Sequence, residues 1–413
     1  MSTDLERSTA LPDQWEHHRR AQDCIAQSYL TNSKRPESLI KGIFPTHAKR
    51  GHGCHIWDHQ GRKYLDFIGG LGTNLLGYAN EPVNDAIRKQ LSDGASLSLA
   101  THHELECAEK LKEMFVFADC WKFLKTGSEA CSAAVRIARA KTGRMWVLSD
   151  GYHGWHDGFV SLTPPHLGCL GAPEMRFSTA KDKGIPPTEV AAIIIEPVLT
   201  EWGPERAHEL QALREHCTKY GIMLIFDEII TGFRFPKFSA AGYFGITPDL
   251  ICLGKAIANG LPLAAVGGKY ATMNAAEYFV SSTYAGETLS LVAAKAVMTQ
   301  LQTKLDLDWL WKQGKAFMET FNAIWPQGVR LEGYPTRGRL GGQDAAKALF
   351  MQEACTAGML FGPSWWFNFP MVEEWRNAMG AIRAILEKIQ RGEVVLKGEM
   401  PQSPFAQRVR EAR

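Results

Sequence analysis

The sequence predicts an α/β fold in which helices cover both faces of a mostly parallel sheet. Short continuous apolar runs, such as residues 191–198 (AAIIIEPV) and 222–230 (IMLIFDEII), indicate buried strands. Stretches with helical spacing separate these runs along the chain. Strands that are apolar on both faces and alternate with helices are typical of a parallel sheet between two helical layers.

The N-terminal part precedes this pattern. Its first 40 residues are polar and weakly periodic, so they fit either helical pieces or an extended arm. Residues 54–67 (CHIWDHQGRKYLDF) predict a β-hairpin with its turn at residues 58–61. A Gly-rich loop follows, and residues 83–94 (VNDAIRKQLSDG) predict a helix.

Strands and helices alternate regularly from residue 121 onward. The predicted strands are 121–127, 145–151, 191–198, 222–230, 249–255 and 263–268, and the predicted helices are 128–143 and 209–221, each ending at a glycine. Beyond about residue 305 the pattern weakens to helices with a few short strands and ends in a basic, polar segment. We expect a central α/β domain flanked by terminal pieces that form a smaller domain.

Composition restricts the class of protein. The 413 residues carry a formal net charge of +2, which gives no electrostatic reason to expect nucleic acid or an anionic membrane as a partner. The nine cysteines are scattered and lack a CxxC motif, which fits thiols in a reducing compartment. The N-terminus does not resemble a signal peptide, and no run of about 18 apolar residues occurs. We expect a soluble, cytoplasmic protein.

Lys255 is the first candidate for chemistry. It directly follows a predicted buried strand and precedes a Gly-containing turn, in DLICLGKAIANGLPLAAVGG. Partial desolvation makes a lysine amine more nucleophilic, as imine chemistry requires. A lysine that merely extends to the surface at a strand end fits this segment equally well. The dipeptide Gly254-Lys255 is not a P-loop, because the first glycine and the Ser/Thr of that motif are missing.

Acidic residues end the apolar run of a predicted strand. Asp227 and Glu228 follow the apolar residues 222–226, so Asp227 is expected at the carboxyl edge of the sheet, where open α/β folds bind ligands. An aspartate there can keep a pyridine nitrogen protonated, which makes the ring an electron sink. Acids that cap a strand or bind a metal are the alternative.

Two further segments could hold a ligand. Thr126-Gly127-Ser128-Glu129 lies between a strand and a helix, with Ser128 suited to cap the helix and Gly127 allowing close approach of a phosphate. Tyr152 follows another strand, where its ring could stack on a flat ligand. An ordinary helix cap and ordinary aromatic packing are the alternatives.

These motifs together, from about Gly51 to Lys295, resemble the class III (fold type I) aminotransferases that depend on pyridoxal 5′-phosphate (PLP), nearest the glutamate-1-semialdehyde aminomutase branch. The resemblance rests on WDHQGRKYLDF, KTGSEACSAAVRIARAKTGR, DGYHGWHD, LIFDEIITGFR, FGITPDLICLGK and STYAGETLSLVAA. It implies a large domain with a seven-stranded, mostly parallel sheet between helices, and a smaller α+β domain from both termini. We place the boundaries at residues 1–65, 66–305 and 306–413.

The resemblance also implies roles for individual residues. Lys255 matches the lysine that carries PLP as a Schiff base, and Asp227 matches the partner of the pyridinium nitrogen. Thr283 matches a threonine that reaches the phosphate of the neighbouring subunit, which implies a homodimer with shared active sites. The remaining matches are the phosphate cup (Gly127, Ser128), the two residues on either face of the ring (Tyr152, Ile229), a buried acid near the cofactor (Glu196) and a gatekeeping glutamate (Glu201).

The sequence departs from the family pattern at two places. Glu287-Thr288 stands where the family often has Asn-Pro, and the sequence suggests no mechanism for the change. The segment after the YHG motif (DGFVSLTPPHLGCLGAPEMRFS) is shorter than the lid of the aminomutases. A short lid suits a transaminase, which releases one product and admits a second substrate.

Other candidates stay open or are set aside. His52, Cys54, His55 and His59 have ligand-like spacing but fall on different faces of the hairpin, so we predict no metal site. Histidines at 102, 103, 153 and 156 either line the pocket or pack. The segment Trp365-Trp366-Phe367 forms either a substrate wall or small-domain core, and Arg337 and Arg339 either bind a substrate carboxylate or lie on the surface.

The predicted function is transfer of an amino group from an amine or amino-acid donor to an aldehyde or keto acceptor, with a sugar or semialdehyde as one suggested class. The alternatives are an intramolecular aminomutase of the glutamate-1-semialdehyde type and a PLP-binding protein without turnover. A regulator of that kind would carry a DNA-binding module, for which the N-terminal 50 residues are too short and insufficiently basic.

Overall fold

The computed structural model describes residues 14–162 and 168–402. The chain forms two compact units, and the described residues are divided between them. The central unit comprises Gly70–Leu76 and Asn80–Lys312, and the terminal unit comprises the residues up to Gly69, Gly77–Ala79 and the residues from Gln313 onward. The N-terminus examined for a leader and the basic C-terminal segment lie outside the described residues.

The central unit contains most of the alternating strands and helices. Its strands are β4 (Cys120–Leu124), β5 (Trp146–Asp150), β6 (Phe177–Thr179), β7 (Val190–Ile195), β8 (Met223–Glu228), β9 (Leu250–Leu253) and β10 (Ala264–Gly268). Its helices are α2 (Glu81–Leu91), α3 (His102–Met114), α4 (Gly127–Thr142), α5 (Asp157–Val160), α6 (Pro204–Tyr220), α7 (Ala240–Phe244), α8 (Tyr270–Met273) and α9 (Thr288–Thr303); α10 spans Leu307–Asn322.

These seven strands form one sheet in the order β4-β10-β9-β8-β7-β5-β6. The pairs from β9 to β6 are parallel, whereas β10 runs antiparallel to both β9 and β4. The predicted mostly parallel, seven-stranded sheet of the fold type I architecture is therefore confirmed.

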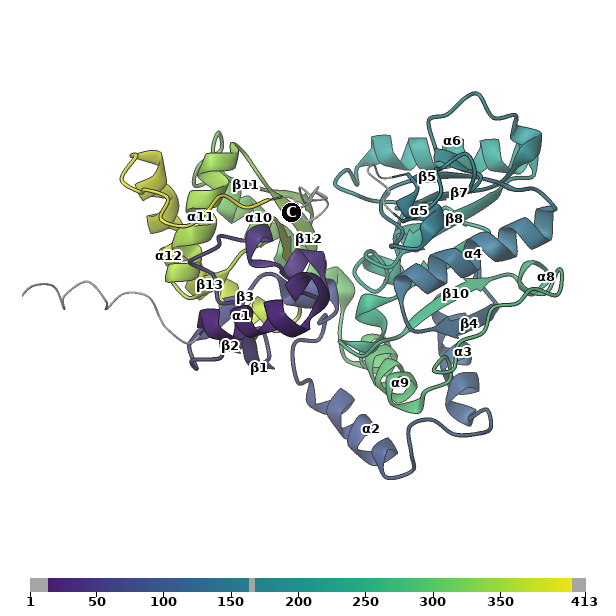
Figure 1. Cartoon of the computed structure of the whole chain (residues 1–413), viewed down its shortest axis with the longest axis horizontal. Helices are drawn as coiled ribbons and strands as arrows, with labels where there is room; N and C mark the ends of the chain where they lie inside the picture. The colour runs from purple at the N-terminus through teal and green to yellow at the C-terminus, as the bar shows by residue number, and fades with distance from the viewer. Residues whose placement is uncertain (1–13, 163–167, 403–413) are drawn as a thin grey trace, which may run out of the picture. The chain divides into compact units, whose positions relative to one another are not determined.

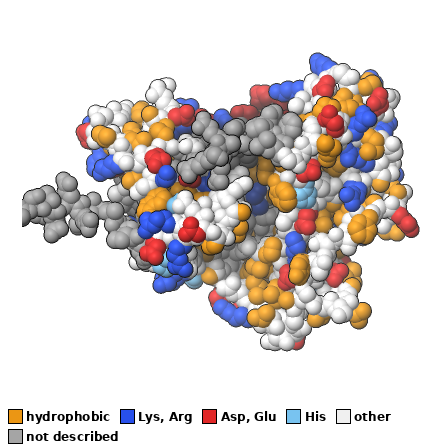
Figure 2. Space-filling view, viewed as in Figure 1, with side chains coloured by type: hydrophobic (Ala, Val, Ile, Leu, Met, Phe, Trp, Pro, Cys, Tyr) orange, Lys and Arg blue, Asp and Glu red, His pale blue; other side chains and the backbone are white. Residues whose placement is uncertain are grey.

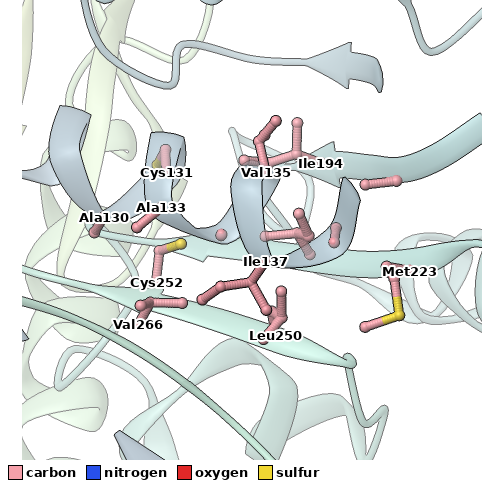
Figure 3. Close-up of a cluster of buried hydrophobic side chains, with 14 of the residues drawn as sticks. Ala130, Cys131, Ala133, Val135, Ile137, Ile194, Met223, Leu250, Cys252 and Val266 are labelled. Atoms are coloured by element: carbon pink, nitrogen blue, oxygen red, sulfur yellow. The ribbon is translucent and has the colours of Figure 1, made fainter. Parts of the chain in front are cut away.

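Successive residues of the central strands enter two different cores, one on each face of the sheet. Met223 and Ile225 of β8 pack in a cluster with α4, whereas Leu224 and Phe226 pack in a second cluster with α6. Figure 3 shows the first cluster, in which alanine, valine and isoleucine side chains of α4 meet Ile194, Leu250 and Val266 of the strands. Figure 1 shows α4 and α6 on opposite sides of this sheet. Burial on both faces explains the continuous apolar runs of the sequence.

The terminal unit holds two small sheets and an aromatic core. Its sheets have the orders β1-β2-β3-β13 and β11-β12-β14. Phe317 contributes to the core, and its ring lies 5.3 Å from that of Phe67 and 5.6 Å from that of Phe367. The elements are α1 (Gln14–Cys24), β1 (Ala48–His52), β2 (His55–Asp58), β3 (Lys63–Asp66), β11 (Arg330–Tyr334), β12 (Arg337–Gly341), α11 (Asp344–Thr356), β13 (Met359–Leu360), β14 (Ser364–Trp366) and α12 (Met371–Gln390).

The hairpin predicted at residues 54–67 is present, because β2 pairs antiparallel with β3. Asp58 closes its turn by accepting hydrogen bonds from the backbone N–H of Arg62 at 2.9 Å and from Arg62 Nε at 2.7 Å. The sequence allowed either helical pieces or an extended arm in the first 40 residues, and the structure has a helix, α1, over Gln14–Cys24. Among the helices of residues 14–162 and 168–402, none is both long and apolar enough to cross a membrane.

Candidate active site

Neighbouring parallel strands end at one edge of the central sheet and bring distant segments together. Asp150 of β5 pairs with Ile195 of β7, and Asp227 of β8 pairs with Cys252 of β9. The loop after β5, the turn after β8 and the turn that contains Lys255 therefore all begin at this carboxyl edge. This is the edge at which open α/β sheets bind ligands.

Asp227 is a buried polar group at this edge that accepts three hydrogen bonds. It is almost fully buried. Its Oδ2 accepts a hydrogen bond from His153 Nδ1 at 2.8 Å and one from the Cys131 thiol at 3.3 Å. Its Oδ1 accepts the backbone N–H of Ile229 at 3.0 Å. Donors from the loop after β5, from α4 and from the turn after β8 thus fix the carboxylate, and Oδ1 keeps the larger remaining capacity to accept a hydrogen bond.

His153 is the ion-pair partner of Asp227 when its ring is protonated. Its side chain is fully buried, and Nδ1 must carry a proton in order to donate to Asp227. Burial lowers the pKa of His153, but the hydrogen bond and the negative charge of Asp227, with a further contribution from Glu196, outweigh burial and raise it. Within the described structure, Nε2 is buried without a hydrogen-bond partner. The raised pKa of His153 favours its protonated form, whose positive charge faces the Asp227 carboxylate.

Lys255 follows the neighbouring strand β9, after Gly254. It opens a short 3₁₀-helix, is half-buried, and has a φ of 43°. A lysine in the left-handed region is strained by on the order of 1 kcal/mol or more, and such residues are concentrated at functional sites. The fold therefore holds the backbone of Lys255 in a special conformation directly beside the strand that carries Asp227.

Ile229 lies between two glycines of the site. A Cβ atom added to Gly127 would be 3.1 Å from Ile229 Cγ2, and one added to Gly254 would be 2.9 Å from Ile229 Cδ1. The missing side chains let Ile229 pack against both the start of α4 and the residue before Lys255. The structure thus brings together Gly127, Ile229 and Gly254, the residue directly before Lys255.

The first turn of α4 is capped by Thr126. Thr126 Oγ1 accepts the backbone N–H of Glu129 at 3.2 Å, and Glu129 Oε2 accepts the backbone N–H of Thr126 at 2.8 Å. The expectation that Ser128 caps this helix is wrong, because the reciprocal Thr126/Glu129 capping box places Ser128 inside the first turn. The backbone N–H groups of Gly127 and Ser128 are among those that an α-helix leaves without an intrahelical acceptor, and the helix dipole favours an anion there.

The loop after β5 is packed tightly onto this helix start. Ser128 Oγ accepts the backbone N–H of Trp155 at 3.3 Å. Gly154 has a φ of 103°, and a Cβ atom there would lie 2.2 Å from Ser128 Oγ. Only glycine fits both the backbone conformation and this approach.

Glu196 holds the beginning of the same loop. This buried residue follows β7, and its Oε1 accepts the backbone N–H of Tyr152 at 2.9 Å. Gly151 permits the contact, since a Cβ atom there would be 2.8 Å from the same oxygen. Glu196 therefore fixes the backbone that carries both Tyr152 and His153.

Thr283 and Glu201 are also predicted site residues. Among the described residues, no hydrogen bond or ion pair identified in the structure links either of them to Asp227, His153, Lys255 or the start of α4. Both are exposed, Thr283 in a turn before α9 and Glu201 in the loop before α6. Residues 163–167 of the predicted short lid lie outside the described residues.

Glu228 has a structural role. It is completely buried and accepts hydrogen bonds from Thr231 Oγ1 at 2.8 Å and from the backbone N–H groups of Ala240 and Ala241 at 2.7 and 2.9 Å. Burial raises the pKa of Glu228 to about 7, although these donors oppose the rise. Of the two adjacent acids, Asp227 faces the site and Glu228 holds the start of α7.

For several residues of the terminal unit, the sequence left two roles open, and their surroundings in the structure favour one of them. Trp365, Trp366 and Phe367 are buried, and the Trp365 ring lies 6.0 Å from that of Phe317, which favours the core reading. Arg339 is exposed and binds Glu332 at 3.0 Å, which favours the surface reading. Cys54 Sγ lies 3.8 Å from His55 Nδ1, whereas His59 packs against His17.

Two groups in the described part of the chain have ligand atoms close enough to hold a metal ion: Cys131 with His153 and Asp227, and His102 with His103 and Glu106. Hydrogen bonds within the first group engage its carboxylate. In the second group the ammonium of Lys295 contacts Glu106, so a cation is already present. We assign no metal to either.

Sequence reasoning missed Cys131 and undervalued His153. Cys131 lies one turn after Gly127, so helical spacing places the two on one side of α4. His153 was visible only as a loop histidine. Its pairing with Asp227 joins residues 74 positions apart in the chain, and no local pattern predicts that.

The chain is similar in sequence to known proteins. The family model described as aminotransferase class-III matches residues 40–172 and 174–372. The glutamate-1-semialdehyde 2,1-aminomutase of Aquifex aeolicus is 33% identical over 286 residues, covering 63% of this chain and 68% of that protein. The 3-aminobutyryl-CoA aminotransferase of Cloacimonas acidaminovorans is 33% identical over 303 residues, covering 69% and 72%.

Solved structures show the same fold. The FumI protein of Sphingopyxis sp. MTA144, in its PLP internal aldimine form, has a TM-score of 0.84 and 22% identity, covering 94% of this chain and 98% of that one. An omega-transaminase from Sphaerobacter thermophilus has a TM-score of 0.77 and 24% identity, covering 93% and 99%. At these identities the likeness concerns the fold alone.

Proposed function

Because the chain belongs to the class-III aminotransferases, which are PLP-dependent enzymes, we propose that Lys255 carries the cofactor and that Asp227 holds its ring nitrogen. The observation that carries this assignment is the convergence of three donors, His153, Cys131 and the Ile229 amide, on Asp227 beside the strand that leads to Lys255. The reaction is transfer of an amino group from an amine or amino-acid donor to an aldehyde or keto acceptor.

The residues at this edge fit the parts of PLP. The first turn of α4, with the amides of Gly127 and Ser128, suits a phosphate. Ile229 would offer an apolar surface to one face of a flat ring, and Tyr152 would offer an aromatic surface to the other. Oδ1 of Asp227 has accepting capacity for a protonated ring nitrogen. Glu196 supports this cradle through the backbone of Tyr152.

The bound cofactor supplies the electron sink for carbanionic charge on the substrate. His153 and Cys131 donate hydrogen bonds to Asp227 and would hold its carboxylate in place for the ring nitrogen. With the cofactor bound, Lys255 Nζ would be the group that takes up and returns the proton of the reacting carbon. His153 remains hydrogen-bonded to Asp227 and orients it.

The named relatives include both reaction types, an aminomutase and an aminotransferase. We favour intermolecular transfer because the segment after the YHG motif is short. An intramolecular aminomutase of the glutamate-1-semialdehyde type is the second candidate, and a non-catalytic PLP-binding protein is the third. Retention of both Lys255 and Asp227 argues for turnover. A sugar or a semialdehyde remains a proposed acceptor class.

We further propose a homodimer with shared active sites, in which Thr283 reaches the cofactor phosphate of the other subunit. Thr283 is exposed, and the nearby Tyr284 and Phe279 are 60% and 80% exposed in the single chain. Leu97 and Leu99 are exposed as well, and Figure 2 shows hydrophobic side chains on the surface over α2 and α9 of the central unit. Exposed apolar side chains gathered on one face commonly mark an interface, and these residues are candidates for it. A cytoplasmic location accords with nine free cysteines, most of them buried.

A donor screen tests the proposed reaction. The PLP-loaded protein is mixed with single amines and amino acids, and absorbance reports conversion of the cofactor to its aminated form. In an aminotransferase, a donor alone converts the bound cofactor to its aminated form, and a carbonyl acceptor restores the original form. The Lys255→Ala protein should show neither response. Isomerisation of glutamate-1-semialdehyde without conversion by any separate donor would contradict intermolecular transfer.

A further inference from the structure

The departure from the family pattern at Glu287 has a partner in the structure. Glu287 is the N-cap of α9, and its Oε2 lies 2.9 Å from Lys125 Nζ. Only 13% of the Lys125 side chain and 15% of the Glu287 side chain are exposed. Lys125 follows β4 and directly precedes Thr126, the N-cap of α4. The ion pair therefore joins the N-terminal ends of two helices, one of which begins with Gly127 and Ser128.

The Glu287 carboxylate is fully engaged. Its Oε1 accepts the backbone N–H of Leu289 at 2.6 Å, and its Oε2 accepts Ser290 Oγ at 2.6 Å as well as Lys125. Burial raises the pKa of Glu287, but these donors and the charge of Lys125 outweigh burial and lower it, so the group is ionised. An amide at this position would cap the helix without attracting the ammonium of Lys125.

The pair also fixes the turn that carries Thr283. The backbone N–H of Glu287 donates to the carbonyl of Tyr284 at 3.1 Å, and that of Ala285 donates to the carbonyl of Ser282 at 3.1 Å. Residues 282–287 thus form a compact turn whose last residue is held by Lys125. Thr288 anchors the next position through Oγ1, which donates to the carbonyl of Gly94 at 2.8 Å.

We propose that Lys125 and Glu287 are positioning residues. Their ion pair fixes the start of α4 at the phosphate site of its own chain and the Thr283 turn that reaches the phosphate site of the other subunit, and so determines how firmly the dimer retains the phosphate end of PLP. This inference rests on the proposed function, because it takes the start of α4 as the phosphate site. The pair is neutral as a whole. Loss of Lys125 would leave an unpaired carboxylate close to an anion, and loss of Glu287 would free both the turn and the ammonium.

Release of the cofactor distinguishes positioning from two simpler roles. The rates of PLP release from the holoprotein into a trapping protein are compared for the parent, Lys125→Met, Glu287→Asn and the double variant. Asn at 287 is a good helix cap, so the helix end is conserved. Positioning predicts that each single variant releases PLP about ten-fold faster, and that the double variant is no faster than either single one.

Further measurements make the outcome specific. The ³¹P resonance of bound PLP should shift in both single variants, whereas the release of pyridoxal, which lacks the phosphate, should be unchanged. Glu81→Gln, which removes an exposed ion pair with Arg88 on α2, is the matched control and should release PLP like the parent. Thermal unfolding of the apo-proteins reports any effect on the fold alone.

Two results would overturn the inference. Slower release from Glu287→Asn together with faster release from Lys125→Met would indicate simple charge attraction. Unchanged release with a lower apo-protein melting temperature would indicate a structural ion pair only. If the parent binds no PLP, the proposed function itself fails; if the parent binds PLP and the variants match it, only this inference fails.

Discussion

Asp227 illustrates what individual residues reveal at this site. Its position after five apolar residues predicted that it would reach the sheet edge, and it does so almost fully buried. Two of its three donors, Cys131 and His153, lie 96 and 74 positions away in the chain, and the third is the backbone N–H of Ile229. Sequence reasoning identified the acid because its signal is local, and missed Cys131 because that contact depends on how α4 lies on the sheet.

Replacement of Asp227 by Asn tests its role. The amide has one acceptor oxygen where the carboxylate has two, so it cannot both satisfy its present donors and keep a ring nitrogen protonated. We expect largely retained PLP binding and proton abstraction slower by on the order of 10²-fold or more. Single-turnover absorbance kinetics measure this rate. An unchanged rate would show that Asp227 does not act on the ring nitrogen.

At the scale of elements, the buried strands and their helices were predictable because apolar runs and helical spacing are local properties. The helix α3 and the short strand β6 were not predicted. The three residues of β6 show no apolar run, and α3 has a histidine-rich, charged sequence in which only part of one face is buried. The alternation of β8 between two cores shows why its sequence is continuously apolar.

Glu228 provides a test of one connection between elements. In Glu228→Gln the side-chain NH₂ replaces an acceptor of the Thr231, Ala240 and Ala241 donors, so at least one buried donor loses its partner. We expect a loss of about 2 kcal/mol in the free energy of unfolding. Chemical denaturation measures the loss, and Glu81→Gln on the exposed face of α2 should change little.

The effect of Glu228 on stability should also depend on pH. The pKa of Glu228 rises from 4.5 in the unfolded chain to about 7 in the fold. Between these two pH values the folded protein therefore keeps a proton that the unfolded chain has lost. This contribution to stability is complete below pH 4.5 and declines as the pH rises towards 7. The difference between parent and Glu228→Gln should therefore shrink over that range. A difference that grows with pH would mean that Glu228 is ionised in the fold.

At the scale of the whole molecule, the chain folds as two units, and the proposed cofactor residues all belong to the central one. The resemblance supplied the identity of the cofactor, whereas composition and periodicity alone supplied only the α/β class. Neither could reveal the Lys125–Glu287 pair, because its partners are 162 positions apart and the sequence showed only that Glu287 was unusual.

Assembly is tested through Thr283. If this exposed threonine completes the phosphate site of the other subunit, Thr283→Ala should weaken PLP retention, and removal of the cofactor should loosen the dimer by linkage. Sedimentation of the holoprotein at micromolar concentration measures the assembly. A monomer with full cofactor occupancy would contradict both the shared site and the role of Thr283.

The central claim is that Lys255 carries the cofactor, and borohydride reduction tests it most directly. Reduction fixes PLP to the lysine that holds it, and peptide mapping then identifies that residue. The account predicts label on Lys255 and none in a folded Lys255→Ala protein. Label on another lysine, such as the half-buried Lys125 beside the start of α4, would contradict it.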